Sequence, residues 1–153
     1  MANTYSQIYI QIVFAVEERE ALIQPTWEEE LFKYITGIVQ TKGQKMISIN
    51  GAFDHLHLFI GMKPTCNLSD LVREIKKSSS EFIKEKKFTH FGFRWQEGFG
   101  AFSYNHSQIP DVSNYIKNQK EHHRKRTFRE EYMTILNSND IDYKEEYLFH
   151  WFE

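Results

Sequence analysis

The first part of the chain alternates apolar and polar residues in the way that a half-buried β-strand does. Residues 5–16 combine this alternation with β-branched and aromatic side chains, which predicts the first strand. Apolar residues then recur at helical spacing over residues 27–39. Thr26 and Glu29 have the spacing of a capping box before this run, and Gly43 follows it. The pattern predicts the first helix.

The middle of the chain predicts a hairpin followed by a basic amphipathic helix. Residues 46–50 and 55–60 predict two short strands, close enough in sequence to pair as a hairpin. Asn67 or Ser69 can cap the helix that follows, in which apolar positions such as Ile75 recur on one face. The other faces carry the basic residues Arg73, Lys76, Lys77, Lys84 and Lys87.

The last third predicts one more strand and then helices. Residues 93–104 have strand character, interrupted by Gly98 and Gly100, which mark a bulge or a close backbone approach. The elements expected after it are a helix from Pro110 to about His123, a helix over residues 128–136 with a Thr127/Glu130 capping box, and an aromatic, acidic stretch over residues 143–153 that is either helical or extended.

This order of elements, βαββαβ followed by helices, predicts an α+β fold. It matches the ferredoxin-like split βαβ pattern, which is RRM-like and has a mainly antiparallel sheet with helices on one face. We expect the other face to be covered by the extra helices, by a partner or by a ligand.

Length and composition fit one folded domain over residues 1–153. The chain is 41% hydrophobic and 26% charged, which excludes a disordered or collagen-like protein. No stretch approaches the roughly 18 apolar residues of a membrane span, and no basic segment precedes an apolar one as in a signal peptide. We therefore expect a cytoplasmic protein with no membrane partner. The single cysteine, Cys66, excludes an internal disulfide.

Charge is distributed unevenly along the chain, although the net charge is only -2. Residues 63–126 hold 13 Lys and Arg against 7 Asp and Glu, whereas residues 128–153 hold 2 against 7. The basic middle could bind a polyanion, or its charges could simply solvate helix faces.

Two histidines flank one leucine in the predicted strand at residues 55–60. Because side chains alternate across a strand, His55 and His57 project to one face while Leu56 projects to the other. Two imidazoles at this spacing suit one divalent metal ion if a third ligand is present. Otherwise they are two hydrogen-bonded or exposed histidines. Asp54 is either a partner that orients one imidazole or a turn residue.

A tyrosine and a glutamine share one face of the third predicted helix. Tyr115 and Gln119 are four residues apart, which places them about one turn apart. A tyrosine beside a metal-bound phosphate can act as a covalent nucleophile, and a glutamine carbonyl can complete the coordination of the metal. The alternative is that Tyr115 only packs against its neighbours.

Three blocks of the sequence together resemble the HUH single-tyrosine transposases. The blocks are residues 53–60 (FDHLHLFI), 95–103 (WQEGFGAFS) and 115–123 (YIKNQKEHH), in this order. Those enzymes are encoded by small bacterial and archaeal insertion sequences that move as single-stranded DNA. The resemblance extends from the first strand to the region around Tyr132, and three blocks are far more specific than any one.

The resemblance implies roles for individual residues. His55 and His57 would be the HUH pair, and Gln119 the third ligand of a Mg²⁺ or Mn²⁺ ion. Tyr115 would attack the scissile phosphate of single-stranded DNA, leaving a 5′-phosphotyrosine and a free 3′-OH. The 3′-OH then attacks another such linkage to join strands, so no ATP is needed.

The resemblance also implies partners. Members of the family are typically homodimers that recognise DNA hairpins, often with the tyrosine helix of one subunit serving the HUH site of the other. Two alternatives stay open: a host-domesticated relative associated with repetitive palindromic elements, and a noncatalytic single-stranded nucleic-acid-binding module on the same fold. From charge alone, the candidate DNA-binding residues are Arg73, Lys76, Lys77, Lys84, Lys87, Arg124, Lys125 and Arg126.

Overall fold

The computed structural model describes residues 3–18, 21–90 and 92–152, and its elements follow the predicted order. Four strands form one antiparallel sheet in the order β2-β3-β1-β4, which is the ferredoxin-like arrangement. The elements are β1 (Tyr9–Ala15), α1 (Pro25–Thr41), β2 (Lys45–Gly51), β3 (His55–Gly61), α2 (Leu68–Lys86), β4 (Gly100–Tyr104), α3 (Ile109–Lys117), α4 (Gln119–Lys125) and α5 (Phe128–Ser138). The predicted fold class is confirmed.

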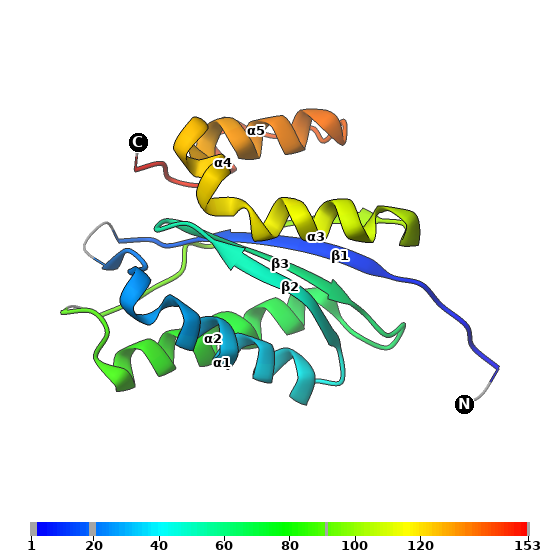
Figure 1. Cartoon of the computed structure of the whole chain (residues 1–153), viewed down its shortest axis with the longest axis horizontal. Helices are drawn as coiled ribbons and strands as arrows, with labels where there is room; N and C mark the ends of the chain where they lie inside the picture. Colours follow the sequence, from blue (N-terminus) through cyan, green and yellow to red (C-terminus); the bar gives the residue numbers. More distant parts are fainter. Residues whose placement is uncertain (1–2, 19–20, 91, 153) are drawn as a thin grey trace.

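Helices cover both faces of the sheet (Figure 1). Helices α1 and α2 lie on one face, and α3, α4 and α5 lie on the other. The sheet face opposite α1 and α2 is therefore covered by the extra helices of the same chain. This is one of the three possibilities that the sequence left open.

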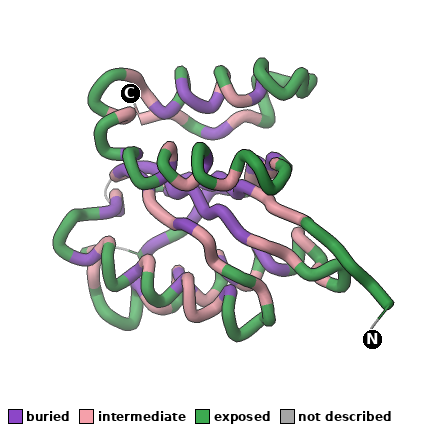
Figure 2. The backbone as a smooth tube through the Cα atoms, turned by 45° about the vertical axis from the view of Figure 1, so that its right-hand side comes forward, coloured by how far each residue is buried: buried purple, intermediate pink, exposed green. Residues whose placement is uncertain are grey.

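The sheet divides its side chains between two environments. Alternate residues of β1 and β3, such as Phe14 and Leu58, join the large apolar core beneath α1 and α2. The residues between them, such as Val13 and His57, point to the face covered by α3 and α5. Figure 2 shows that the middle of the sheet is buried while the helices on either side keep exposed outer surfaces.

The start of the first helix differs from its prediction. Helix α1 begins at Pro25 with Gln24 as its N-cap, and no side chain caps it, so the predicted Thr26 capping box is wrong. Proline at the first helical position has its φ already fixed and no N–H to satisfy, which lets the helix start two residues earlier than predicted. The Asn67 cap of α2 and the Thr127/Glu130 capping box of α5 are confirmed.

The fourth strand is shorter than predicted. Only Gly100–Tyr104 pairs continuously with β1, whereas Trp95 makes a single isolated bridge to Val16. Gly98, at a φ of 82°, turns the chain between the two segments. The aromatic residues before it, which have a strand-like composition, pack into the core without joining the ladder.

The predicted helix from Pro110 to His123 is two helices. Helix α3 ends at Lys117 and α4 starts at Gln119, with Asn118 at φ -96° and ψ 21° between them. Asparagine readily leaves helical geometry because its side chain competes for backbone hydrogen bonds. The break turns the side chain of Gln119, only 1% exposed, into the protein.

The described part of the C-terminal stretch has no helix or strand apart from one 3-10 turn at Glu145–Tyr147, and Glu153 lies outside the described residues. Phe149 and Trp151 pack against α5. Among the described residues, no helix is long and apolar enough to cross a membrane.

Candidate active site

The two histidines of the sequence motif lie side by side on the central strands. His55 and His57 occupy alternate positions of β3, opposite Ala15 and Val13 of β1, and both side chains are fully buried. Their rings stand 5.0 Å apart between centroids. The alternation of the strand therefore brings both imidazoles to the face covered by α3 and α5.

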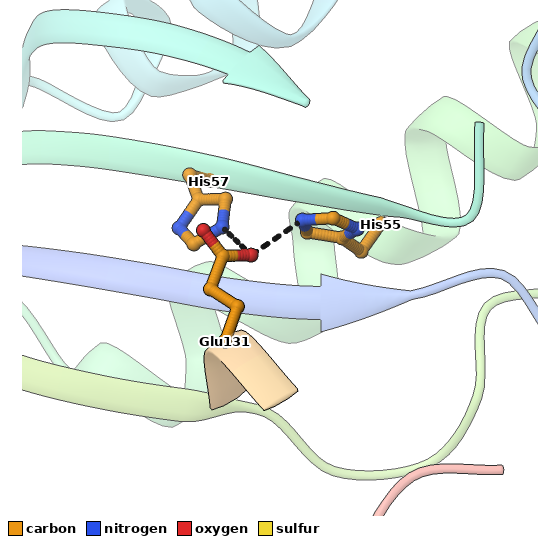
Figure 3. Close-up of side chains that lie close together, drawn as sticks. All are labelled: His55, His57 and Glu131. Atoms are coloured by element: carbon orange, nitrogen blue, oxygen red, sulfur yellow. Dashed lines mark hydrogen bonds and ion pairs between the residues drawn. The ribbon is translucent and has the colours of Figure 1, made fainter. Parts of the chain in front are cut away.

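A carboxylate from α5 meets both imidazoles (Figure 3). Glu131 Oε1 lies 3.1 Å from His55 Nε2 and 3.2 Å from His57 Nε2. The side chain of Glu131 is also buried, with 3% of the residue exposed. Burial of a carboxylate is favourable only where donors or cations satisfy it, as the two imidazoles do here.

Tyr115 contacts the same carboxylate through the other oxygen. Its hydroxyl donates a short hydrogen bond to Glu131 Oε2, and Arg126 Nη2 donates to the phenol oxygen at 3.1 Å. The ring of His122 stacks on the tyrosine ring at a centroid distance of 4.4 Å. The phenol oxygen thus lies between a carboxylate and a guanidinium, next to the histidine pair.

Gln119 completes the cluster. Its Oε1 lies 3.1 Å from His55 Nε2, and its Nε2 donates to Glu131 Oε2 at 2.8 Å. Lys120, the next residue, anchors the start of α4 to the sheet by donating to the Gly51 carbonyl at 2.7 Å. The break between α3 and α4 therefore brings Tyr115 and Gln119 to one place from two helices, not from one face of a single helix.

Opposite charges stabilise each other inside the cluster. Burial acts to lower the pKa of His55, but Asp54 and Glu131 outweigh it and raise the pKa to about 9. Burial dominates at His57 and lowers its pKa. Burial acts to raise the pKa of Glu131, but the two imidazoles outweigh it and hold the pKa far below its usual range. At neutral pH the arrangement is a protonated His55 and a neutral His57 around a carboxylate.

The nucleophile candidate is held as a neutral phenol in this state. Burial and the neighbouring Glu131 carboxylate raise the pKa of Tyr115 well above its ordinary value, while Arg126 acts in the opposite direction. A cation that neutralised Glu131 would remove part of this effect and make the phenolate easier to form.

Two further contacts orient His55. Asp54 Oδ1 lies 2.7 Å from Nδ1, so the carboxylate fixes a proton on that nitrogen and directs Nε2 toward the cluster. Phe128 of α5 stacks on the imidazole at 3.9 Å with an interplanar angle of 6°. Both contacts fix the orientation of the His55 ring, with its Nε2 directed toward Glu131 and Gln119.

The donor set fits a divalent cation. His55, His57 and Glu131 each offer one ligand atom, and these atoms all lie within 4.8 Å of one another. Two imidazole nitrogens with a carboxylate oxygen are a common ligand combination for divalent metals, and the Gln119 carbonyl offers another oxygen. The charge of Glu131 can therefore be balanced either by the protonated His55 or by an added cation.

The basic residues proposed from charge lie in two separate places. Those of α2 lie on the opposite side of the sheet from the cluster, and Lys76 there donates to the Gln96 and Gly98 carbonyls at 2.8 and 2.6 Å. Of those at the end of α4, Arg126 reaches the cluster, where it contacts Tyr115. The structure does not bring the two groups together.

Sequence reasoning missed Glu131. The signal that could have found it is its place on α5, where it shares the buried face of the helix with Phe128, Tyr132 and Leu136. An acidic residue at an otherwise apolar helical spacing needs a buried partner. The neighbouring acid, Glu130, is the exposed member of the capping box with Thr127.

Comparison with known proteins finds one family and several solved structures. The family described as "Transposase IS200 like" matches residues 4–119. The crystal structure of a candidate transposase from Deinococcus radiodurans R1 is similar with a TM-score of 0.61 at 16% sequence identity, covering 78% of this chain and 95% of that one.

A REP-associated tyrosine transposase bound to a REP hairpin is similar with a TM-score of 0.60, also at 16% identity. That match covers 80% of this chain and 73% of the other. The two structural similarities show a shared fold. A comparison with curated protein sequences finds no match.

Proposed function

This chain belongs to the IS200-like transposase family, and on that premise we propose that it cleaves and rejoins single-stranded DNA with Tyr115 as the nucleophile. The observation that carries the proposal is the bridging position of Glu131, whose two oxygens contact both histidines and the Tyr115 hydroxyl. A tyrosine placed this close to a candidate metal site is suited to attack a phosphate that is bound there.

We propose that His55, His57 and Glu131 hold a Mg²⁺ or Mn²⁺ ion. Gln119, which the resemblance implied as the third ligand, would then supply a further oxygen from its place 3.1 Å from His55 Nε2. When bound, such an ion supplies positive charge that polarises the scissile phosphate and stabilises the charge of the transition state. The residues of the chain orient that phosphate toward Tyr115.

Tyr115 would form the covalent link. Its phenol oxygen bonds to phosphorus, the bond from phosphorus to the 3′ oxygen breaks, and that oxygen leaves as a 3′-OH after taking a proton. Glu131 Oε2, which already accepts the hydrogen bond from the phenol, is placed to take the tyrosine proton. Arg126 lies at the phenol oxygen and can pair with the phosphate as it approaches.

Joining would reverse the same chemistry. A 3′-OH attacks the phosphotyrosine, a new phosphodiester forms and the Tyr115 phenol is released with a proton. Each step exchanges one phosphate ester for another, so the energy of the broken bond is retained and no nucleotide cofactor is consumed.

We propose single-stranded DNA with hairpins at the ends of an insertion sequence as the substrate. Support comes from the family and from the structural neighbour that is bound to a REP hairpin. Of the candidate DNA-binding residues, Arg124, Lys125 and Arg126 at the end of α4 are nearest in sequence to Tyr115, and Arg126 contacts its hydroxyl. We assign these three to the scissile strand. The basic residues of α2, on the other layer, would contact DNA away from the cleavage point.

The predicted homodimer remains part of the proposal. Within one chain, α4 is anchored to its own sheet by Lys120, and Tyr115 reaches the Glu131 of the same chain. A dimer could therefore act without exchanging tyrosine helices. Mixing Tyr115→Phe with His57→Ala protein tests this: cis assembly leaves the mixture inactive, and trans assembly restores part of the activity.

The proposal is tested by a denaturing gel of the protein with labelled single strands copied from both flanks of its gene. We expect a covalent protein–DNA band that needs Mn²⁺ or Mg²⁺, disappears with EDTA, and is absent for double strands. Tyr115→Phe should abolish the band while leaving DNA binding nearly intact. Tyr147→Phe, at a tyrosine that is 79% exposed, is the matched control and should behave as wild type.

Two outcomes would contradict the proposal. A Tyr115→Phe protein that still forms the adduct would exclude Tyr115 as the nucleophile. Hairpin binding by wild type without any adduct, at saturating metal, would favour the noncatalytic binding module over the enzyme.

A further inference from the structure

A buried glutamine on the central strand contacts the second histidine of the cluster. Gln11 of β1 is 2% exposed, and its Nε2 lies 2.8 Å from His57 Nδ1. Its neighbours across the sheet are Phe59 on β3 and Phe102 on β4, so the position is otherwise apolar. A buried amide costs free energy unless it is hydrogen-bonded, which makes a glutamine here a feature that needs a reason.

A tyrosine from the next strand holds the far end of this amide. Tyr104 of β4 donates its hydroxyl to Gln11 Oε1 at 2.9 Å, and its ring packs edge-on against Phe59 at 6.0 Å. Three strands thus contribute to one chain of hydrogen bonds, from Tyr104 through Gln11 to His57. The chain ends at Glu131 Oε1, 3.2 Å from His57 Nε2.

We propose that Gln11, held by Tyr104, is the positioning residue for His57, directing Nε2 of that imidazole toward the metal site. It is the counterpart of Asp54, which contacts the corresponding nitrogen, Nδ1, of His55. The proposal rests on the proposed function for the metal site toward which His57 is directed.

The two partners differ in what they can do. Asp54 as a carboxylate only accepts, so it keeps a proton on Nδ1 of His55 and leaves Nε2 to face the cluster. An amide can donate through nitrogen or accept through oxygen. With Nε2 of Gln11 toward His57, the imidazole carries its proton on Nε2 and donates it to Glu131.

A metal bound to Nε2 of His57 requires the proton on Nδ1 instead. Gln11 can serve that state after a half-turn of its amide, which presents Oε1 to the Nδ1–H. Tyr104 can follow, because a hydroxyl both donates and accepts. The pair therefore satisfies His57 with and without an ion, whereas an apolar residue at position 11 would leave a buried N–H unpaired in the ion-bound state.

The test is the affinity of the DNA-free protein for Mn²⁺, measured by electron paramagnetic resonance of the free ion. We expect Gln11→Leu to raise the Kd by about 10- to 100-fold, the usual effect of removing the hydrogen-bond partner of a metal-bound histidine. Tyr104→Phe should raise it by about 2- to 10-fold, since it removes one hydrogen bond behind the amide. Gln11→Glu, which can accept from Nδ1, should bind Mn²⁺ at least as tightly as wild type.

The matched control is a second buried glutamine away from the cluster. Gln96, 8% exposed, donates to the Val16 and His150 carbonyls. Gln96→Leu should lower the melting temperature and leave the Kd for Mn²⁺ unchanged. A Gln11→Leu protein within twofold of the wild-type Kd, or an equal loss in Gln96→Leu, would overturn the proposal.

A second measurement separates this inference from the proposed function. In the metal-free protein, the ¹⁵N resonance of His57 Nδ1 should move in Gln11→Leu, while Gln96→Leu moves neither ring nitrogen. If wild type binds no Mn²⁺, the metal site of the proposed function fails, and this resonance alone decides whether Gln11 orients His57. An unchanged Nδ1 resonance in Gln11→Leu overturns the role of Gln11.

Discussion

The two faces of the sheet are built from the same strands, but one forms the largest apolar core and the other carries the candidate active site. On one face, Leu56 and Leu58 of β3 join a continuous apolar core with α1 and α2. On the other, His55 and His57 of the same strand meet Glu131, and the apolar residues around them form two smaller clusters. One strand therefore supplies the largest core with its even-numbered residues and the candidate active site with His55 and His57.

The difference shows where stability and chemistry come from in a small domain. Apolar burial under α1 and α2 stabilises the fold without any polar requirement. The opposite face buries polar side chains, among them His55, His57, Gln119 and Glu131, which are acceptable only because they hydrogen-bond one another. We expect substitutions on the first face to change stability and substitutions on the second to change metal binding and cleavage.

The largest expected effect is the loss of adduct formation in His57→Ala. Removing this imidazole takes away one ligand atom of the candidate metal site and a partner of Glu131. We expect the rate of adduct formation to fall by about three orders of magnitude or more, as for other residues that act as one catalytic unit. Single-turnover gels with labelled single strands measure it. An adduct rate within tenfold of wild type would show that His57 is not part of the site.

The adjacent substitution on the other face, Leu58→Ala, should act on stability. Leu58 is fully buried in the core beneath α1 and α2. Truncating such a side chain removes apolar packing and leaves a cavity, which costs about 2–5 kcal/mol of unfolding free energy. Urea denaturation measures the loss. Below its melting temperature the folded variant should still form the adduct. A variant that folds but cannot cleave would show that this face also contributes to catalysis.

Glu131→Gln sharpens the comparison because it keeps the size of the side chain and removes its charge. The variant retains an oxygen near both imidazoles, so the fold should persist. The loss of a proposed ligand carboxylate should raise the Kd for Mn²⁺ by at least about 10- to 100-fold, the range found when only the hydrogen-bond partner of a ligand is changed. Isothermal titration calorimetry measures this. Glu130→Gln, at the neighbouring exposed acid, is the control and should leave the Kd unchanged.

The histidine cluster also predicts how stability depends on pH in the metal-free protein. The pKa of His55 is raised from 6.5 to about 9 in the folded state. Its proton therefore stabilises the fold fully below pH 6.5, and this contribution is lost as the pH rises toward 9. We expect a loss on the order of 1–3 kcal/mol between these values, measured by urea denaturation with EDTA.

The control for this pH dependence is the Glu131→Gln variant, in which the loss should be smaller. Burial lowers the pKa of Lys76 to about 8, so this residue makes the folded protein more stable as the pH rises above 8. Because Lys76 is present in both proteins, its contribution cancels in the comparison. The difference between the two curves isolates the cluster. Identical curves would show that Glu131 does not hold the proton on His55.

The smallest expected effect separates the two groups of basic residues. Neutralising Arg124 and Lys125 beside the site should weaken single-strand binding and reduce its salt slope by about 0.7 for each phosphate that the protein no longer neutralises. Neutralising Lys77 and Lys84 of α2, on the opposite layer, should leave the binding of a short hairpin-free strand that spans the cleavage point unchanged, because we propose that these residues contact DNA away from that point. Fluorescence anisotropy over a range of salt concentrations measures both. The reverse result would assign the scissile strand to the layer of α2.

The sequence predicted the elements where local patterns are strong. The alternation in β1 and β3, the Asn67 cap and the Thr127/Glu130 capping box all depend on neighbouring residues, and the structure confirms them. It failed where tertiary packing overrides the pattern. The aromatic residues around Trp95 have strand character but fill the core, and the helical spacing through Asn118 hides a break.

Local sequence determined which residues of the site lie together on one element. A period of two sets His55 and His57 on one face of a strand whatever the rest of the chain does. Only the tertiary structure decided what meets them there. Glu131 and Gln11 lie 74 and 46 residues from His57 in sequence, and they reach it because α5 and β1 pack against β3. The chemistry of the pair depends on these distant partners, since burial and hydrogen bonding, not sequence spacing, set the charge and orientation of an imidazole.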